Sequence, residues 1–400
     1  MQLGNIGLGR TGASWPDVLL TRGQQCVLGA LLLSLLGCAV GVKDSMSTQT
    51  NDTVTQPSLS IDPQLGERLY PGEQALAEEI GEVIERSLRG QFASGAILRD
   101  AHPKAHGCVR AEFVVSDTLP DELSHGVFVP GARYQAWIRF SNGSRDATRS
   151  DIKGDARGMA IKLLGVPGVS LLSEEDGSEK SATQDFILIS HPVFFVNDPR
   201  RYLSVVSRAS SDSAASKLLI PFHLGLKGAL IALKTSRKKI SNPVQTRYWS
   251  TVPYQLGTGP NRQAVKYSVR ACSATMDPLP NRPGPNFLRE ALRATLQDGD
   301  ACMEFMVQPR TSVGLSVEDS MTEWTEQQAP FYKVATIRIP RQAFDTQEQN
   351  AFCEKLSFNP WHALPEHRPL GLTNRLRKVI YDRISRIRHE ESFSNPGPGR

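Results

Sequence analysis

The segment NRLRKVIYDRISRIRHE, residues 374–390, places one tyrosine among several arginines. Its apolar residues recur at helical spacing, and a helix turns by about 100° per residue. Arg377, Tyr381 and Arg388 therefore share one face, within roughly 40° of one another. They border an apolar stripe of Leu376, Ile380, Ile384 and Ile387. A phenol held beside guanidinium groups is a candidate anionic ligand.

Two interpretations of this helix remain open. In the first it is an ordinary amphipathic basic helix whose charges are solvated. The residues expected on the solvent side are Arg375, Lys378, Asp382 and Arg386. In the second, Tyr381 serves as a phenolate. A free phenol ionises only near pH ~10, but an arginine one turn earlier and a bound cation would both favour the anion.

Composition excludes several classes of protein. With 400 residues, 40% hydrophobic and 22% charged, the chain can bury a large core. The net charge of +5 is mild, and no dense basic run alternates with aromatic residues, so nucleic acid is not an expected partner. The cysteines lack zinc-site spacing, and their pairing cannot be derived from sequence. They are Cys26, Cys38, Cys108, Cys272, Cys302 and Cys353.

Residues 1–63 are expected to form a leader and a tether. The apolar run 26–42 is short for a membrane-spanning helix and is typical of an export signal. Its end, LLGC, is similar to the bacterial lipoprotein pattern, which implies cleavage before Cys38 and a lipid tether there. An uncleaved anchor and an ordinary signal peptide remain alternatives. Residues 43–63 are polar and lack periodicity. We expect an exported protein, periplasmic or membrane-anchored.

Residues 64–395 are expected to form one α+β domain, a β core flanked by helices. Apolar spacing predicts a helix from residue 73 and further helices near 200–210, 214–234, 286–297 and 373–389. Short segments rich in β-branched and aromatic residues predict an antiparallel sheet or barrel. These are AEFVVS, YQAWIRFS, GMAIKLLG, FILIS, ACMEFMV and YKVATIRIP. Residues 217–239 predict a packed helix with a solvated basic end, or a membrane-associated helix.

In YQAWIRFS, side chains alternate across the strand. Arg139 and Ser141 therefore share one face, opposite Ile138 and Phe140. Taken alone, this pattern indicates a solvated outer face for the two polar residues.

Several motifs together, in chain order, resemble the heme catalases, and in particular the small catalase-related peroxidases. They are RDAHPKAHG (99–107), RFSNGSRDATRSDIKGDARGMAIKLL (139–164), HPVFFVNDPRRY (191–202), DSMTEW (319–324), FNPWHALPEHRP (358–369) and Arg377-x-x-x-Tyr381. The resemblance covers about residues 97–390. It implies an antiparallel β-barrel flanked by helices, with ferric heme b between the barrel and the C-terminal helix.

The resemblance also assigns roles on the proximal side of the heme. Tyr381 is the expected iron ligand, as catalases use a tyrosinate. Arg377 would donate to the phenolate oxygen and keep it anionic. Arg99, Arg139 and Arg388 match the propionate contacts of the family, where guanidinium groups suit carboxylates.

On the distal side, His102 is the expected catalytic base and Ser141 its hydrogen-bond partner, which would turn both Ser141 and Arg139 toward the heme. His106 is a rival for His102. Three aromatic residues would lie near the heme edge: Phe194, Phe195 and Tyr202. A structural histidine and a plain aromatic core are the alternatives.

One position departs from the family. Where catalases usually carry a distal asparagine, this chain has Ile189, followed by Ser190 and His191. We therefore expect a heme peroxidase or catalase-like oxidoreductase that uses a peroxide and a small reductant. A hydroperoxide isomerase and a heme-binding barrel without catalysis are alternatives. A homo-oligomer is a further expectation.

Overall fold

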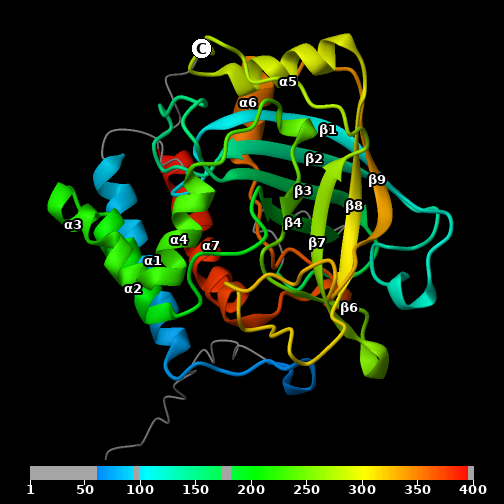
Figure 1. The fold of residues 1–400 in the computed structure, drawn as a ribbon, viewed down its shortest axis with the longest axis horizontal. Helices are drawn as coiled ribbons and strands as arrows, with labels where there is room; N and C mark the ends of the chain where they lie inside the picture. Colours follow the sequence, from blue (N-terminus) through cyan, green and yellow to red (C-terminus); the bar gives the residue numbers. More distant parts are fainter. Residues whose placement is uncertain (1–60, 93–98, 173–181, 395–400) are drawn as a thin grey trace, which may run out of the picture. The chain divides into compact units, whose positions relative to one another are not determined.

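The computed structural model describes residues 61–92, 99–172 and 182–394 (Figure 1). The predicted export signal, the lipid attachment site at Cys38 and most of the predicted tether lie outside these residues.

The described residues contain a closed antiparallel β-barrel. Eight strands form the ring, because β5 pairs with both β4 and β7, and the short β6 adds to β7. The strands are β1 (Ala105–Val115), β2 (Arg133–Asn142), β3 (Arg157–Val166), β4 (Ala182–Ile189), β5 (Tyr248–Trp249), β6 (Tyr254–Leu256), β7 (Gln263–Ala271), β8 (Ala301–Pro309) and β9 (Tyr332–Ile339). The predicted α+β class with a barrel core is confirmed.

The barrel interior is apolar. Ile138 and Phe140 of β2 point into it, as their alternation predicts, and join a core that includes Phe113, Phe186 and Phe305. The opposite face of β2 is the outer wall. Because strand side chains alternate, Arg139 and Ser141 lie on this outer wall, yet both are buried. The expectation of a solvated face is therefore wrong at this end of the strand, where other segments cover the wall.

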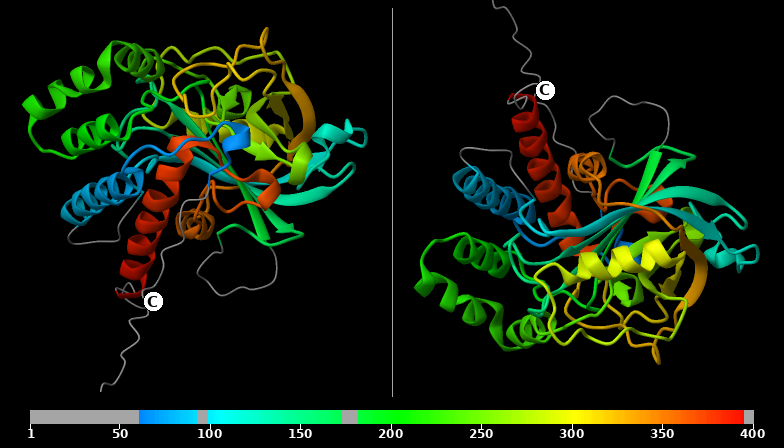
Figure 2. Two further views of the ribbon diagram at one scale, coloured as in Figure 1. Left: turned by 90° about the horizontal axis from the view of Figure 1, so that it is seen from below. Right: turned by 90° about the horizontal axis from the view of Figure 1, so that it is seen from above.

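α1, α2, α3, α4 and α7 gather on one side of the barrel, whereas α5 lies across another part of it (Figures 1 and 2). α1 packs along α7 through Ile80, Ile84, Leu376 and Ile380, so the predicted apolar stripe of the last helix is confirmed. The helices are α1 (Glu73–Gln91), α2 (Pro199–Ala209), α3 (Ala214–Leu218), α4 (Ile220–Ser236), α5 (Phe287–Asp298), α6 (Gln347–Lys355) and α7 (Gly371–Ser394).

The helix predicted over 214–234 is two helices. α3 ends at Leu218, and α4 is kinked at Gly225, whose φ of 69° and ψ of 172° lie outside the helical region. Pro221 lies in the first turn of α4, after the break between α3 and α4. Proline is tolerated at this position of a helix. β5, β6, β7 and α6 were not predicted. β5 and β6 are too short to carry a period, whereas β7 does alternate, with Val265, Tyr267 and Val269 in the barrel core, and was missed.

Two disulfides cross-link segments of the barrel and its surroundings. Cys108 of β1 is joined to Cys353 of α6, and Cys272 is joined to Cys302 of β8. The first bond fixes α6 against the outer wall.

Candidate active site

His102 lies just before β1 and contacts the outer wall of the barrel. Its Nδ1 is 3.0 Å from the Ser141 hydroxyl oxygen of β2. Its φ is 62°, in the left-handed region that non-glycine residues seldom adopt. Such strained backbone is found most often where a side chain must be aimed at a functional site.

Gly158 of β3 makes room for the His102 ring. Ser141 and Gly158 are paired in the sheet, and a Cβ added to Gly158 would lie 2.5 Å from His102 Nδ1. Any side chain at position 158 would therefore push the imidazole away. Sequence reasoning placed Gly158 within the D-x-R-G motif but gave it no role.

The environment keeps His102 neutral. Burial, together with the charges of Arg139 and Arg377, lowers the pKa of His102 from 6.5 to about 4. A neutral imidazole can accept a proton at physiological pH. Because Arg377 belongs to α7, this charge effect also links the His102 side of the site to the last helix.

Ile189 lies next to this histidine site. It ends β4 and is paired in the sheet with Gly158, the residue beneath the His102 ring. Ser190 does not replace an amide here, because its hydroxyl accepts the Arg157 backbone N–H at 2.9 Å. His191 is turned to its own loop, where Nδ1 is 3.2 Å from the Val193 carbonyl oxygen. An apolar side chain thus stands where a polar one was expected.

His106, the rival base, lies within β1. Its ring is buried, and Nδ1 is 3.7 Å from the Asp151 carboxylate. Burial lowers the pKa of His106 to about 3. No contact with Ser141 is present among the described residues, so this histidine lacks the partner that orients His102.

Three arginines converge beside His102. Arg99 and Arg388 both bind the Glu354 carboxylate of α6, at 2.6 and 3.2 Å. The Arg99 guanidinium also donates to the Cys353 and Leu356 carbonyl oxygens. Arg139 donates to the Pro103 carbonyl at 3.3 Å. The three predicted propionate ligands are therefore neighbours, although they come from three distant segments.

This cluster carries an excess of positive charge. Burial and the nearby Arg99 and Arg388 lower the pKa of Arg139 well below its ordinary value. Burial and Arg99 lower the pKa of Arg388 to about 10. The buried Arg139 Nε has no hydrogen-bond partner among the described residues. Unsatisfied buried donors are costly, so the cluster fits a dianionic group such as the two propionates of heme.

On α7, Arg377 lies near aromatic side chains. Its guanidinium lies over the Phe194 ring, 5.6 Å from the centroid, and Nη1 is 3.4 Å from the Asn374 side-chain oxygen. Phe194 stacks with Phe195 at 4.4 Å and meets Tyr202 edge-on. No hydrogen bond joins Arg377 to Tyr381 within the described segments, so the predicted bond to the phenolate stays a prediction.

Tyr381 packs partly buried among α1 and α2 side chains, together with Tyr202. Burial and the charges of Asp100 and Tyr381 raise the pKa of Tyr202, which keeps that phenol neutral. The motifs HPVFFVNDPRRY and DSMTEW contact each other beside these aromatic residues, since the Phe194 N–H donates to the Ser320 carbonyl at 2.8 Å.

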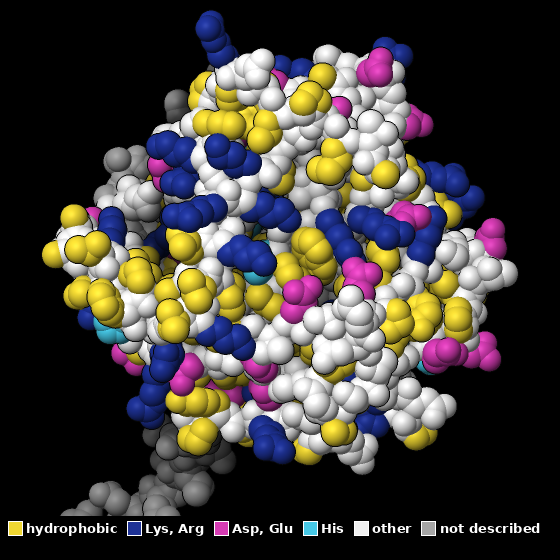
Figure 3. Space-filling model, in the orientation of Figure 1, with side chains coloured by type: hydrophobic (Ala, Val, Ile, Leu, Met, Phe, Trp, Pro, Cys, Tyr) yellow, Lys and Arg dark blue, Asp and Glu magenta, His cyan; other side chains and the backbone are white. Residues whose placement is uncertain are grey.

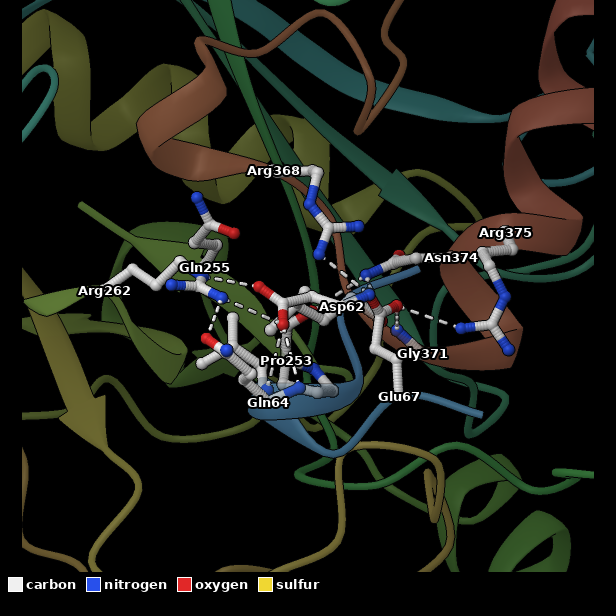
Figure 4. A network of polar contacts seen from close by, with 12 residues as sticks. Asp62, Gln64, Glu67, Pro253, Gln255, Arg262, Arg368, Gly371, Asn374 and Arg375 are labelled. Atoms are coloured by element: carbon white, nitrogen blue, oxygen red, sulfur yellow. Dashed lines mark hydrogen bonds and ion pairs between the residues drawn. The ribbon is translucent and has the colours of Figure 1, made fainter. Parts of the chain in front are cut away.

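The start of α7 is fixed by a buried ionic network (Figure 4). Arg375, expected on the solvent side, is fully buried and pairs with Glu67, Glu73 and Glu318 at 2.5–3.0 Å. The expectation that Arg375 is solvated was wrong, because the carboxylates that cover it come from distant segments and cannot be found from the spacing within α7. Glu67 also accepts the Gly371 N–H at 2.8 Å, which caps the helix. Burial alone would lower the pKa of Arg375, but Glu73 and Glu318 outweigh burial and raise it.

Comparisons with known proteins bear on the fold. No protein-family model matches the sequence. The catalase-related peroxidase of Mycolicibacterium paratuberculosis (strain ATCC BAA-968 / K-10) is 25% identical over 236 residues, which are 57% of this chain and 69% of that protein. A fungal catalase structure superposes with a TM-score of 0.60 at 18% identity, over 76% of this chain and 63% of that one. Catalase A from Saccharomyces cerevisiae gives 0.58 at 18%, over 76% and 64%.

The chain has a catalase-like fold, and its sequence is similar to that of a catalase-related peroxidase. It spans less than two thirds of the length of the two solved catalases. In this catalase-like chain, Glu354 is a residue of the site that sequence reasoning missed, and no local signal marks it. Gly158 had a signal, since it stands in a motif already recognised.

Proposed function

We propose that this chain is a heme-dependent oxidoreductase that consumes peroxides, with His102 as the catalytic base and Tyr381 as the iron ligand. The observation that carries the proposal is the outer-wall cluster itself. A neutral, strained imidazole held by Ser141 stands beside the clustered guanidinium groups of Arg99, Arg139 and Arg388, and the buried Arg139 Nε has no hydrogen-bond partner among the described residues.

The residues present fit ferric heme b. Arg99, Arg139 and Arg388 would bind the propionates, and the unpaired Arg139 Nε would gain a partner. Phe194, Phe195 and Tyr202 offer aromatic surfaces for the ring edge. Tyr381 would supply an anionic oxygen to the iron, with Arg377 supporting the anion. When bound, the heme would supply an iron centre that gives two electrons to the peroxide and regains them from the small reductant.

His102 performs the proton transfer. As a neutral base it accepts the proton from the inner oxygen of the peroxide, and it returns this proton to the outer oxygen, so that the O–O bond breaks heterolytically. Ser141 holds Nδ1, which leaves Nε2 to carry the proton. A positioned base of this kind accelerates a reaction by about 10²–10⁴-fold.

Ile189 favours peroxidase turnover over rapid disproportionation of hydrogen peroxide. Its apolar side chain cannot hydrogen-bond a second small peroxide, whereas it suits an organic hydroperoxide and a separate small reductant. The same apolar contact also suits a hydroperoxide isomerase, which is the second candidate function. Such an isomerase would consume the hydroperoxide without any reductant.

Further proposals concern the cellular setting. The apolar run at 26–42 supports export, and the Cys108–Cys353 and Cys272–Cys302 bonds support an oxidising compartment. We also propose a lipid tether at Cys38 and a homo-oligomer.

The decisive experiment is reconstitution of the full chain with hemin. The expected result is a ferric, high-spin spectrum of the tyrosinate type that Tyr381→Phe abolishes. Tyr332→Phe, on the exposed part of β9, is the matched control and should leave the spectrum unchanged. A wild-type protein that stays colourless with hemin would refute the proposal.

Substrate assays then separate the candidates. Oxygen release from hydrogen peroxide indicates a catalase, oxidation of an added phenol indicates a peroxidase, and loss of an organic hydroperoxide without reductant indicates an isomerase. A protein that binds heme but performs none of these reactions would be the barrel without catalysis.

A further inference from the structure

α3 and α4 present a row of large apolar side chains to solvent. Leu218, Phe222 and Leu226 are 75%, 78% and 80% exposed. Leu219, Leu230 and Leu233 extend the same row. Figure 3 shows hydrophobic side chains gathered over these helices, with Lys and Arg side chains around them. Monomeric soluble proteins seldom expose contiguous apolar surface of this kind, so it needs a partner.

The orientation of α4 differs from that of an ordinary surface helix. Its buried positions include Gly228, which lies so close to the neighbouring chain that an added Cβ would be 2.6 Å from the Phe195 carbonyl oxygen. Ala229 and Ala232 pack beside it. Gly228, Ala229 and Ala232 face the protein together with Leu224, whereas Leu226, Leu230 and Leu233 face outward, so α4 exposes more apolar surface than is usual for a surface helix. The close approach at Gly228 fixes this orientation.

The charges within α3 and α4 are all positive, although Asp212 precedes α3 and Lys227 lies 3.9 Å from Asp319. Residues 213–240 contain no Asp or Glu. The exposed cations are Lys217, Lys227, Lys234, Arg237 and Lys239. A second copy of the chain is a poor occupant, because a symmetric contact would bring two basic faces together without an acidic partner. An anionic surface with an apolar layer beneath it complements both the charges and the leucines.

By length and composition, Ala214–Ser236 could cross a membrane. Of its most apolar 18-residue window, 11% is buried inside the protein. A spanning helix must satisfy its backbone internally. Here Gly225 breaks the helix, three lysines lie within the segment, and Leu224 and Gly228 are packed against the fold. Both views in Figure 2 show α3 and α4 standing out from the barrel as a ridge. The segment therefore suits a position on a membrane rather than through it.

We propose that α3 and α4 dock the protein on the surface of a bilayer that contains anionic lipids. Phe222, Leu226 and Leu230 enter the boundary between headgroups and acyl chains, and the flanking lysines pair with lipid phosphates. This inference goes beyond the proposed function and does not depend on it. It is also independent of the predicted lipid at Cys38, because it rests on residues 214–240 alone.

The test uses the full chain with vesicles of phosphatidylcholine alone or with added phosphatidylglycerol. The expected result is at least tenfold stronger cosedimentation with the anionic vesicles, weakened by salt. Hydrogen–deuterium exchange should show new protection confined to α3 and α4, which separates this surface from any binding through the leader. Leu226→Glu combined with Leu230→Glu should remove both effects.

The control is Val313→Glu, which places the same charge on a side chain that is 91% exposed in the loop after β8. It should bind like the wild type. Equal binding by the wild type and the double variant, without protection of α3 and α4, would overturn the proposal. So would a dimer, measured by light scattering without vesicles, that the double variant dissociates, since a second copy would then cover the row.

Discussion

Two histidines, His367 buried inside the barrel and His102 partly buried on its outer wall, show how one residue type can have different roles. Both ring nitrogens of His367 are satisfied, one by the Val127 N–H and one by the Tyr267 hydroxyl, each at 3.0 Å. Its ring also meets Phe128 edge-on at 5.0 Å. The His102 ring is held by the Ser141 hydroxyl at 3.0 Å and by the Asn142 backbone, and its own backbone is left-handed.

Burial lowers the pKa of both residues, to about 3 for His367 and about 4 for His102. The low pKa therefore does not distinguish a structural histidine from a catalytic one. The distinction lies in the surroundings, because both ring nitrogens of His367 are bonded inside the closed barrel, whereas the ring of His102 lies on the outer wall beside Arg139 and Arg377.

The largest expected effect is on activity at the outer wall. His102→Asn keeps a residue that tolerates the left-handed backbone but removes the base. Peroxide turnover of the hemin-loaded protein should fall by about 10²–10⁴-fold. The urea midpoint should stay near that of the wild type. A variant that turns over normally would show that His102 is structural, like His367.

The next largest effect is on stability in the interior. His367→Ala leaves the Val127 N–H and the Tyr267 hydroxyl without partners and opens a cavity, which should cost about 3 kcal/mol of unfolding free energy. Folded, hemin-loaded protein should retain its turnover. His389→Ala, at the exposed end of α7, is the control. Urea titration measures the difference, and an unchanged midpoint would contradict the account of the interior.

Gly158→Ala tests whether the position beneath the His102 ring must lack a side chain. The new methyl group overlaps the imidazole, so turnover should fall by about tenfold to a hundredfold while the barrel remains folded. Gly299→Ala, where an added Cβ meets nothing within 4 Å, provides the comparison. Equal turnover in the two variants would mean that the His102 ring can shift without cost.

Arg139→Met should have opposite effects on the hemin-free and hemin-loaded protein. Removing a buried cation from beside Arg99 and Arg388 should raise the unfolding free energy without hemin by about 1 kcal/mol. The affinity for hemin should fall by about tenfold, because a propionate contact is lost. Arg338 is an exposed residue of β9, and Arg338→Met should change neither the unfolding free energy nor the affinity for hemin. Loss of stability in Arg139→Met would indicate a structural arginine.

The smallest expected effect is that of mild acid. Only the unprotonated imidazole accepts a proton, so kcat/KM should stay nearly constant from pH 7 to 5 and reach half near pH 4, the pKa of His102. The heme spectrum, recorded at each pH, excludes loss of the cofactor. An inflection near pH 6.5 would mean that the proton is taken by a histidine in an ordinary environment.

Much of the fold follows from local pattern. The alternation in YQAWIRFS predicts which side chains enter the barrel, and the stripe of Leu376 and Ile380 predicts the contact of α7 with α1. The short β5 and β6 could not be found, because two or three residues carry no period. Their role, closure of the ring, depends on distant partners.

For the site, the motifs led to His102, Ser141 and the arginines, whereas spacing alone misplaced two of the charges. Arg139 and Arg375 look like solvated residues until distant segments cover them. Glu354 could not be predicted as a site residue, because it belongs to the site only through its ion pairs with Arg99 and Arg388, which are 255 and 34 residues away. Long-range ionic networks leave no periodic trace in a sequence.

The bond between Cys108 and Cys353 sets an order of assembly. It closes a loop of 245 residues, so it forms only after nearly the whole chain has emerged. The same bond holds the Cys353 carbonyl against Arg99, one of the three guanidinium groups of the cluster. The contact between Arg99 and α6 is therefore completed only when residues far apart in the chain have come together and Cys108 has been oxidised.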